Sequence, residues 1–445
     1  MADPHIRGCG TPWPIGLGLG EIRVHQLDDT ELGGRQRLES RPSEGLVLQR
    51  HGDRGQAVVD FGLTAVAYLS SHAGEQALRV VDGYGLTETT RVGDIASIRT
   101  QFGEHAPVLV ETVLLRRRAA AKFADPSDWL FTDDALQQAT AQPVAEHRAR
   151  RLAGESVHDV TCSVGTELAA LRNSAAYVVG SDIDPVRLAM ARHNVGEVTL
   201  CRADALRPIT RDTVVLADPA RRRSGRRRFD PRDYAPPLDG LLDAYGDHDL
   251  VVKCAPGIDF AELGRLGFNG EIEVVSLDGS VREACLWSPG IAEVGVHRRA
   301  TVLDGPEQIT DAEPDDCGVA PVGRWIVDPD GAVVRTGLVR HYAARHGLWQ
   351  LDPDIAYLSG DRLPDGVRGF EVLDELAFSE KRLRQALSAR DAGAVEILVR
   401  GVDVDPDALR RRLRLRGSRQ VSVVITRIGS GTASRATAFV CRPSW

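Results

Sequence analysis

Four aspartates in the middle of the chain stand where short apolar segments end, and these residues are well placed to bind a ligand. Asp159 opens the turn Asp159-Val-Thr-Cys-Ser-Val-Gly165, Asp182 ends the second apolar segment, and Asp204 and Asp218 follow the third and fourth. In open α/β sheets, ligands bind at the carboxyl ends of the strands. Parallel strands would therefore bring the four carboxyl groups to one edge, where they can accept hydrogen bonds from hydroxyl and amino groups.

The segments that would position these aspartates alternate between short apolar runs and helical stretches from Glu155 onward. This alternation predicts a parallel sheet flanked by helices, and the fold class is therefore α/β. The expected strands are 157–161, 177–182, 198–201, 213–217, 249–254, 272–277 and 283–287. The last two are separated by about five residues, which is too short for a helical crossover. They are expected to form an antiparallel hairpin at one edge of the sheet.

The length of 445 residues suits about three domains. Glycine-rich residues 1–56 lack an apolar period and are expected to form a poorly ordered tail. Apolar spacings of three and four predict a helical domain over 57–130. The α/β pattern occupies 131–303, an acidic, proline-rich stretch at 304–321 is expected to be a linker, and an α+β domain is expected over 322–445.

Helix start and stop signals refine this division. Thr132 is placed to cap a helix, and Pro143 to open the next one. In the last domain, Asp405 caps, Pro406 begins and Gly417 stops a helix. The expected elements there are a strand at 395–399, a helix at 406–416, and strands at 420–427 and 436–441.

The composition excludes several classes of protein. Apolar residues make up 42% and charged residues 27% of the chain, which is typical of a globular protein. No run reaches the roughly 18 apolar residues of a membrane span, and no leader pattern opens the sequence, so a cytoplasmic location is expected. Seven cysteines without a CxxC pair argue against disulfides and zinc, and no metal is expected. The net charge of −8 excludes a polycation that coats nucleic acid.

Several motifs in this order resemble the class I S-adenosylmethionine-dependent methyltransferases, and specifically the branch with a THUMP-like C-terminal domain. The resemblance covers residues 131–445 and rests on the order and spacing of the motifs together. It implies a Rossmann-like sheet for the α/β domain and a THUMP-like fold for the last domain. The motifs are Gln138-Ala-Thr140, Asp159-x-Thr-Cys, Ser181-Asp-Ile-Asp-Pro185, Asp218-Pro-Ala-Arg-Arg222, Ala255-Pro-Gly257, Leu351-Asp-Pro-Asp-Ile355 and Phe370-Glu-Val-Leu373.

The resemblance implies S-adenosylmethionine as the cofactor, a molecule with a ribose diol, an adenine amino group and a cationic sulfonium. Asp182 is expected to bind the diol, because Asp184, which precedes Pro185, suits the capping position better. Asp204 is expected to accept from the adenine amino group, with an ordinary loop aspartate as the alternative. The expected cofactor-binding residues are Thr140, Asp159, Thr161, Cys162, Gly165, Asp182, Ile183, Asp204 and Ala205.

The first turn departs from the family pattern of three alternating glycines. Thr161 and Ser163 replace the first two, and only Gly165 remains, which is expected to make the tight turn. The two hydroxyls either bond the ligand or make local turn hydrogen bonds. Thr140 is expected near the methionine carboxylate, with a plain helix-end threonine as the alternative.

Asp218-Pro219-Ala-Arg221 occupies the position of the acceptor motif of amino methyltransferases, although the stacking aromatic is missing. Asp218, Pro219 and Arg221 are the expected catalytic residues: the aspartate orients the acceptor, proximity lowers the barrier, and the arginine contacts phosphate or stacks on a base. A nucleophilic cysteine at Cys162 or Cys254 is the rival mechanism, and a buried structural thiol is the simpler interpretation of both.

Two groups of arginines favour an RNA substrate. Arg221, Arg222, Arg223, Arg226, Arg227 and Arg228 follow the acceptor motif, where they would attract phosphates and bind the substrate. Arg410, Arg411, Arg412, Arg414, Arg416 and Arg419 lie on or after the helix of the last domain. Solvated, ion-paired surfaces are the alternative for both groups.

The expected function is methyl transfer to a base in structured RNA, either tRNA or rRNA. Two alternatives stay open. The altered glycine turn and the missing aromatic would suit a non-catalytic RNA-binding protein, and the net acidity would suit a methyltransferase for a small molecule or a protein.

Overall fold

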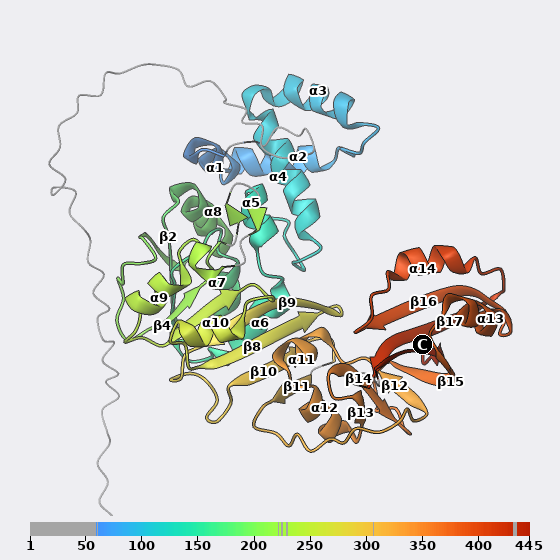
Figure 1. Cartoon of the computed structure of the whole chain (residues 1–445). Helices are drawn as coiled ribbons and strands as arrows, with labels where there is room; N and C mark the ends of the chain where they lie inside the picture. Colours follow the sequence, from blue (N-terminus) through green and yellow to red (C-terminus); the bar gives the residue numbers. More distant parts are fainter. Residues whose placement is uncertain are drawn as a thin grey trace, which may run out of the picture.

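The computed structural model describes residues 59, 61–220, 222–223, 226–227, 230–305, 307–429 and 434–445, with only the backbone at 222–223 and 226–227. The predicted tail at 1–56 lies outside these residues. A central mixed sheet has a group of N-terminal helices on one side and a second sheet beside it (Figure 1).

The central sheet has nine strands in the order β11-β10-β8-β9-β7-β4-β1-β2-β3. Strands β3, β2, β1, β4 and β7 are parallel, and β9 runs antiparallel to both β7 and β8. The predicted α/β alternation is therefore confirmed. The bounds are β1 Ser156–Asp159, β2 Tyr177–Asp182, β3 Thr199–Arg202, β4 Val214–Ala217, β7 Leu250–Cys254, β8 Glu271–Leu277, β9 Ser280–Trp287, β10 Arg298–Val302 and β11 Glu307–Thr310.

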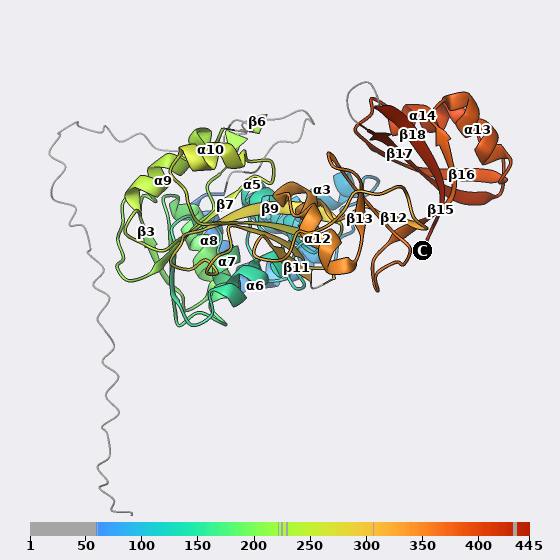
Figure 2. The ribbon, with the colours of Figure 1, turned by 60° about the horizontal axis from the view of Figure 1, so that its bottom comes forward.

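Helices cover both faces of this sheet, which is why β4 and β7 are buried along their whole length and, apart from Lys253, consist of apolar residues (Figure 2). The α6 and α7 side chains Ala149 and Leu168 pack in one core cluster, and Leu241 and Leu263 of α9 and α10 pack in another. Asp184 caps α8 through the backbone N–H groups of Val186 and Arg187, as expected. The bounds are α6 Gln142–Arg151, α7 Thr166–Leu171, α8 Pro185–Val195, α9 Leu238–Ala244 and α10 Phe260–Arg265.

Two expectations about the edge of the sheet are wrong. The β8–β9 hairpin forms as predicted, but it lies inside the sheet, because β10 pairs in parallel with β8. The stretch 304–321, expected to be a linker, contributes β11, which pairs antiparallel with β10. Ile309 and Cys317 of this stretch are buried in the core of the central sheet, although its acidic, proline-rich composition predicted a linker.

The N-terminal helices form their own apolar core, which continues onto α8 beside the central sheet. Leu78, Ile98 and Leu109 pack in one cluster with Met190 of α8. Thr132 caps α5 by accepting from the backbone of Ala135, as the sequence predicts. The bounds are α1 Leu63–Leu69, α2 His72–Asp82, α3 Arg91–Phe102, α4 Ala106–Ala119 and α5 Asp133–Gln138, with a 3₁₀ turn at Gly103–His105.

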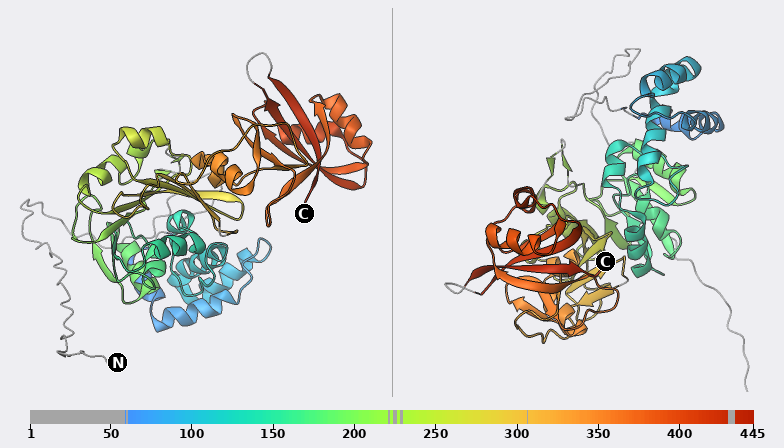
Figure 3. Two further views of the ribbon diagram at one scale, coloured as in Figure 1. Left: turned by 90° about the horizontal axis from the view of Figure 1, so that it is seen from below. Right: turned by 90° about the vertical axis from the view of Figure 1, so that its right-hand side faces the viewer.

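The C-terminal part contains a seven-stranded sheet in the order β13-β14-β12-β15-β18-β17-β16. Helices α13 and α14 pack through Leu383 and Leu409 onto Val423 of β17 (Figure 3). Asp405 caps α14 as expected, but the helix ends at Leu413, because Arg414 adopts a left-handed conformation. The bounds are β12 Trp325–Val327, α11 Gly331–Thr336, α12 Val339–His346, β13 Trp349–Asp352, β14 Ile355–Gly360, β15 Gly369–Ala377, α13 Glu380–Ser388, β16 Ala392–Arg400, α14 Pro406–Leu413, β17 Arg419–Ile428 and β18 Arg435–Pro443.

Helix α11 connects the C-terminal part to the central sheet. It packs on β8 and β10, and its buried Val333 belongs to the same core as Val252 of β7. Arg335 donates to the carbonyl oxygen of Pro256 at 2.6 Å and to that of Ile258, and its guanidinium lies 4.2 Å from the centre of the Phe260 ring. The loop that follows β7 is therefore held from the C-terminal part of the chain.

Candidate functional site

A cavity of about 630 Å³ opens at the carboxyl ends of β1 to β4. Its wall includes all four aspartates that the sequence placed at this edge. We call it the donor cavity. The lining residues are Ala135, Gln138, Ala139, Asp159, Val160, Thr161, Cys162, Ser163, Val164, Thr166, Glu167, Asp182, Ile183, Arg187, Asp204, Ala205, Leu206, Asp218, Ala220, Arg232, Asp233, Tyr234, Ala235, Pro236 and Pro237.

The turn after β1 forms the base of the donor cavity. Gly165 has a φ of 90°, and a Cβ atom at this position would lie 2.8 Å from a methyl group of Val195. Only glycine meets both conditions without strain, so this residue makes the tight turn, as predicted. Ser163, where the family pattern has glycine, also has a positive φ, 50°. Its backbone N–H donates to Oδ2 of Asp182 at 2.9 Å, so the turn is tied to the next strand.

Asp182 is fixed at the end of β2. Its Oδ1 accepts from the backbone N–H of Asp184 at 2.9 Å, and its Oδ2 accepts from Ser163. Each carboxylate oxygen has a second acceptor site, so the group remains able to bind two ligand hydroxyls. Ile183 beside it is 64% exposed and lines the same wall, where an apolar ligand surface could cover it. Asp204 lines the same cavity, and its Oδ1 accepts from the backbone N–H of Leu206 at 3.0 Å.

Asp159 and Cys162 line the cavity as predicted, but both are buried. Burial raises the pKa of Asp159 well above its usual range, and the neighbouring Glu167 raises it further, which favours the neutral acid. Asp159 accepts from the backbone N–H of Thr161 at 3.1 Å. Burial also raises the pKa of the Cys162 thiol well above its usual range, which disfavours the thiolate that a nucleophile needs. The other candidate, Cys254, is fully buried in β7.

Asp218 enters the donor cavity from the end of β4, and the first turn fixes its backbone. Its N–H donates to Oγ1 of Thr161 at 2.6 Å. This bond joins residues 57 positions apart in the sequence, so it is not the local turn hydrogen bond that was one of the two predicted uses of the Thr161 hydroxyl. Ala220 forms a β-bridge with Ala235, and this bridge brings Tyr234 into the cavity wall. Pro219 lies between Asp218 and Ala220 without lining the cavity.

Lys253 holds the side chain of Asp218, and sequence reasoning missed this residue. Its ammonium donates to Oδ2 of Asp218 and to Oγ1 of Thr140, and it lies 3.5 Å from Oε1 of Glu167. Thr140 in turn donates to Oε1 of Glu167 at 2.6 Å. Thr140 is therefore occupied behind the donor cavity and does not line it, so its expected contact with the methionine carboxylate is not supported.

These side chains belong to a buried group of five charges, which we call the Lys253 cluster: Asp218, Lys253, Glu167, Arg148 and Glu283. Arg148 of α6 forms ion pairs with both Glu167 and Glu283. Burial raises the pKa of Glu167, but Arg148 and Lys253 outweigh it and lower the pKa to about 2. Burial lowers the pKa of Lys253, but Asp218 and Glu167 outweigh it, so the ammonium form is favoured. Only Asp218, with 23% of its side chain exposed, reaches solvent to any extent.

Tyr234 is the second residue that sequence reasoning missed. It follows Asp218 by 16 residues in the printed sequence, and the cis peptide bond between Ala235 and Pro236 follows it directly. Its hydroxyl accepts from the backbone N–H of Ala255 at 3.3 Å, which joins the segment after β4 to the loop after β7. The acceptor motif therefore has an aromatic residue beside it, although not at the position where the family pattern places one.

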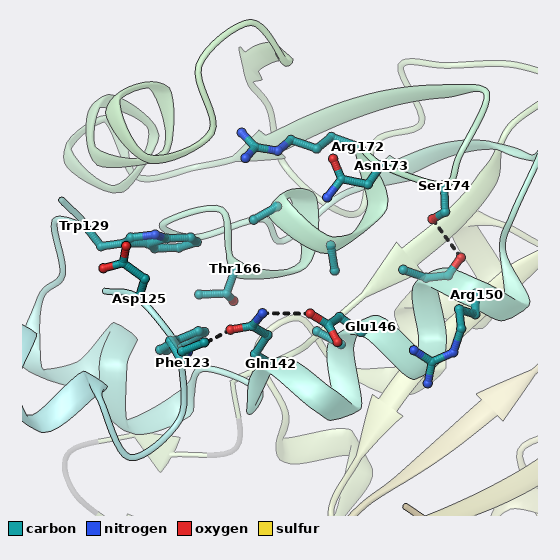
Figure 4. Close-up of a pocket in the computed structure, with 15 residues that line it drawn as sticks. Phe123, Asp125, Trp129, Gln142, Glu146, Arg150, Thr166, Arg172, Asn173 and Ser174 are labelled. Atoms are coloured by element: carbon teal, nitrogen blue, oxygen red, sulfur yellow. Dashed lines mark hydrogen bonds between the residues drawn. The ribbon is translucent and has the colours of Figure 1, made fainter. Parts of the chain in front are cut away.

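Another cavity, of about 470 Å³, lies on the face of the sheet between α6 and α7 (Figure 4). Alanines form much of its floor, Phe123 and Trp129 lie at one end, and Gln142 donates to Glu146 at 2.7 Å within it. None of the four aspartates lines it. The predicted chemistry therefore belongs to the donor cavity.

Of the predicted cofactor-binding residues, the donor cavity brings together Asp159, Thr161, Cys162, Asp182, Ile183, Asp204 and Ala205. Gly165 shapes the turn beneath it, and Thr140 lies behind its wall. Arg221 and Arg228 lie outside the described residues, and of the arginines between them only the backbone is described. Arg222–Arg223 and Arg226–Arg227 form a two-stranded hairpin, β5–β6, near the end of β4.

Comparisons with known proteins agree with this fold. Residues 367–443 match the family model described as THUMP domain-like. Two proteins of Mycobacterium tuberculosis, from strains CDC 1551 and H37Rv, are named as S-adenosylmethionine-dependent methyltransferases; each is 70% identical over 357 residues, which cover 78% of this chain and 100% of theirs. A solved structure from Porphyromonas gingivalis W83, named as a methyltransferase, has a TM-score of 0.66 at 18% identity over 86% of this chain and 98% of its own, and shows the fold alone.

The sheet and the donor cavity define a class I methyltransferase fold with a THUMP-like C-terminal domain. With relatives at 70% identity over most of its length, the chain belongs to the S-adenosylmethionine-dependent methyltransferases. It is an enzyme of this family, and its cofactor is S-adenosylmethionine. The donor cavity fits this molecule, because it combines carboxylates for hydroxyl and amino groups with an exposed apolar side chain, Ile183.

Two further observations concern metals and membranes. Among the residues that the structure describes, no three His, Cys, Asp or Glu side chains are grouped so that they could hold a metal ion. None of the helices in the described part of the chain combines the length and apolarity that crossing a lipid bilayer requires.

Proposed function

We infer that this methyltransferase modifies a base in structured RNA, either tRNA or rRNA. The observation that carries this proposal is a group of six exposed arginines on and beside α14 of the THUMP-like domain: Arg410, Arg411, Arg412, Arg414, Arg416 and Arg419. Arg410 and Arg412 pair with Asp407 and Glu380, whereas the other four form no ion pair with a described residue. Exposed guanidinium groups outside such ion pairs suit binding of phosphates.

In the proposed donor site, Asp182 binds the ribose hydroxyls and Asp204 accepts from the adenine amino group. Ile183 and Ala205 cover the apolar faces of the nucleoside, and the Gly165 turn lets the backbone approach the methionine part. Asp159, Thr161 and Cys162 shape the wall. These assignments follow from the wall residues and their hydrogen-bonding capacity.

In the proposed acceptor site, Asp218 and the backbone carbonyl of Pro219 orient the nitrogen or carbon that receives the methyl group. The S-adenosylmethionine supplies an electrophilic methyl group, so the enzyme's residues need only hold the acceptor in line with it. Arg221 contacts the target nucleotide, and Arg222, Arg223, Arg226, Arg227 and Arg228 contact phosphates near it. The Lys253 cluster keeps Asp218 in place for this role.

Transfer of tritiated methyl groups tests the acceptor directly. Cell extract from a strain that lacks the protein is incubated with the purified enzyme and labelled S-adenosylmethionine, and is then separated into RNA, protein and small molecules. We expect label in RNA, and we expect Asp218→Asn to reduce it at least about 100-fold at saturating donor, because the acceptor loses its orienting carboxylate. Label in protein or small molecules instead would contradict the RNA proposal.

The contribution of the α14 surface is tested by its salt dependence. A variant in which Arg411, Arg414, Arg416 and Arg419 are all alanine should bind bulk RNA more weakly and lower the slope of log K against log[salt] by about three, since each phosphate contact contributes roughly 0.7–0.9. Filter binding over a range of salt concentrations measures both. A slope equal to that of the wild type would assign these arginines to a solvated surface.

A further inference from the structure

Acidic side chains dominate the wall of the donor cavity. Six carboxyl groups line it: Asp159, Glu167, Asp182, Asp204, Asp218 and Asp233. The wall contains only two described cationic side chains, Arg187 and Arg232. Each of them forms an ion pair with a carboxylate outside the wall: Arg187 with Asp184 at 3.7 Å, and Arg232 with Glu262 at 2.8 Å. Even with Asp159 neutral, the wall favours a cation.

The Lys253 cluster shares Asp218 and Glu167 with this wall and adds one carboxylate, Glu283, and two cations, Lys253 and Arg148. It therefore offsets part of the negative charge: with Asp159 neutral, six carboxylates of the wall and the cluster face four cations, and the net charge of these described groups is −2. Four of the five side chains are 6% exposed or less, so solvent screens them little. Lys122 also interacts with Lys253 and Asp218, but it lies outside the wall and donates to three carbonyl oxygens, those of Leu136, Gln137 and Ala139.

We propose that this excess negative charge makes the donor cavity selective for the cationic sulfonium of S-adenosylmethionine over the neutral thioether product, S-adenosylhomocysteine, and that Asp218 determines the selectivity. The two ligands have the same adenine, ribose and amino-acid groups. Their contacts with Asp182 and Asp204 are therefore equivalent, and only the charge on sulfur differs. A charge difference of one unit is felt most strongly beside the buried part of the wall, where Glu167 and Asp182 lie.

The selectivity has a direct consequence for turnover. When the methyl group leaves, the electron pair of the S–CH₃ bond returns to sulfur, and the ligand loses the charge that the cavity attracts. The product is then released more easily than the donor, which limits product inhibition. This inference uses the identity of the methyl donor, S-adenosylmethionine, and the charges of the described side chains. It does not depend on the proposed RNA substrate.

Calorimetric titration of the full chain with each ligand at neutral pH tests the proposal. We expect the wild type to bind S-adenosylmethionine at least about tenfold more tightly than S-adenosylhomocysteine. Asp218→Asn keeps the shape of the side chain and an oxygen for Lys253, but removes one negative charge, so the ratio should fall to between about one and three while the affinity for S-adenosylhomocysteine stays within about twofold. The matched control is Asp243→Asn, an exposed aspartate on α9, which should keep the wild-type ratio.

Two results would overturn the proposal: a wild-type ratio near one or inverted, or a wild-type ratio above ten that persists in Asp218→Asn. The first needs no variant, so a folding defect in Asp218→Asn cannot hide it. Absence of label from RNA together with the expected ratios would reject the RNA substrate and leave the selectivity intact.

Discussion

We expect Asp182→Ala to weaken the binding of S-adenosylmethionine at least about 100-fold in calorimetric titration. The proposed role of Asp182 is to accept two hydrogen bonds from the ribose, and a hydrogen bond to a charged group contributes roughly 1.5–3 kcal/mol. The same carboxylate also accepts from the backbone of Ser163 and Asp184, so the alanine variant loosens the turn after β1 as well. The loss of the ribose hydrogen bonds and the loosening of the turn both weaken the binding of S-adenosylmethionine.

The control for Asp182 lies two residues away. Asp184→Asn also removes a carboxylate charge from this loop, and asparagine caps a helix as well as aspartate does. Because Asp184 does not line the donor cavity, this variant should bind the donor within about twofold of the wild type. If Asp182→Ala bound the donor as tightly as the wild type, the assignment of the ribose site would be wrong.

The second large effect is expected from Arg148, at the centre of the Lys253 cluster. Arg148→Met should lower the free energy of unfolding by about 3–5 kcal/mol, because it leaves Glu167 and Glu283 buried without their shared cation. Arg148 itself is 2% exposed, so water cannot take its place. Urea unfolding followed by circular dichroism measures the change in the transition of the catalytic domain.

A neighbouring arginine on the same helix separates this ion-pair effect from a general effect of losing charge. Arg150→Met removes an exposed side chain of α6 and should change the stability by no more than about 0.5 kcal/mol. Adding Glu283→Gln to Arg148→Met should recover part of the loss, because it removes one of the two stranded charges. Equal stabilities of the Arg148 and Arg150 variants would contradict the buried role of Arg148.

The parallel strands β1, β2, β3, β4 and β7 could be predicted because each lies in a short, largely apolar run of the sequence. Caps such as Thr132, Asp184 and Asp405 mark where helices begin. The place of the β8–β9 hairpin in the sheet could not be predicted in this way. It depends on β10 and β11 pairing beyond it, and β11 is a four-residue strand in a polar segment that is stabilised by its neighbours.

The residues of the candidate site differ in the same way: some could be predicted from neighbouring sequence, and others depend on partners far away in the chain. The four aspartates could be found because each follows its own strand. Lys253 could not, because its partners Asp218 and Thr140 are 35 and 113 residues away, and the lysine stands within an apolar run that reads as an ordinary buried strand. One signal was available: the chain has three lysines, and a charged residue inside a buried strand requires a partner.

The hydrogen bonds from Arg335 to the carbonyl oxygens of Pro256 and Ile258 have a consequence for the order in which parts of the enzyme form during synthesis. Synthesis proceeds from the N-terminus, so a nascent chain that has reached Trp287 already contains every wall residue of the donor cavity, but not α11. The loop after β7 lacks its hydrogen bonds to Arg335 until about 50 residues beyond Trp287 have been synthesised. Competence for catalysis should therefore appear on the ribosome only after α11 has docked, well after the residues that bind the donor have been made.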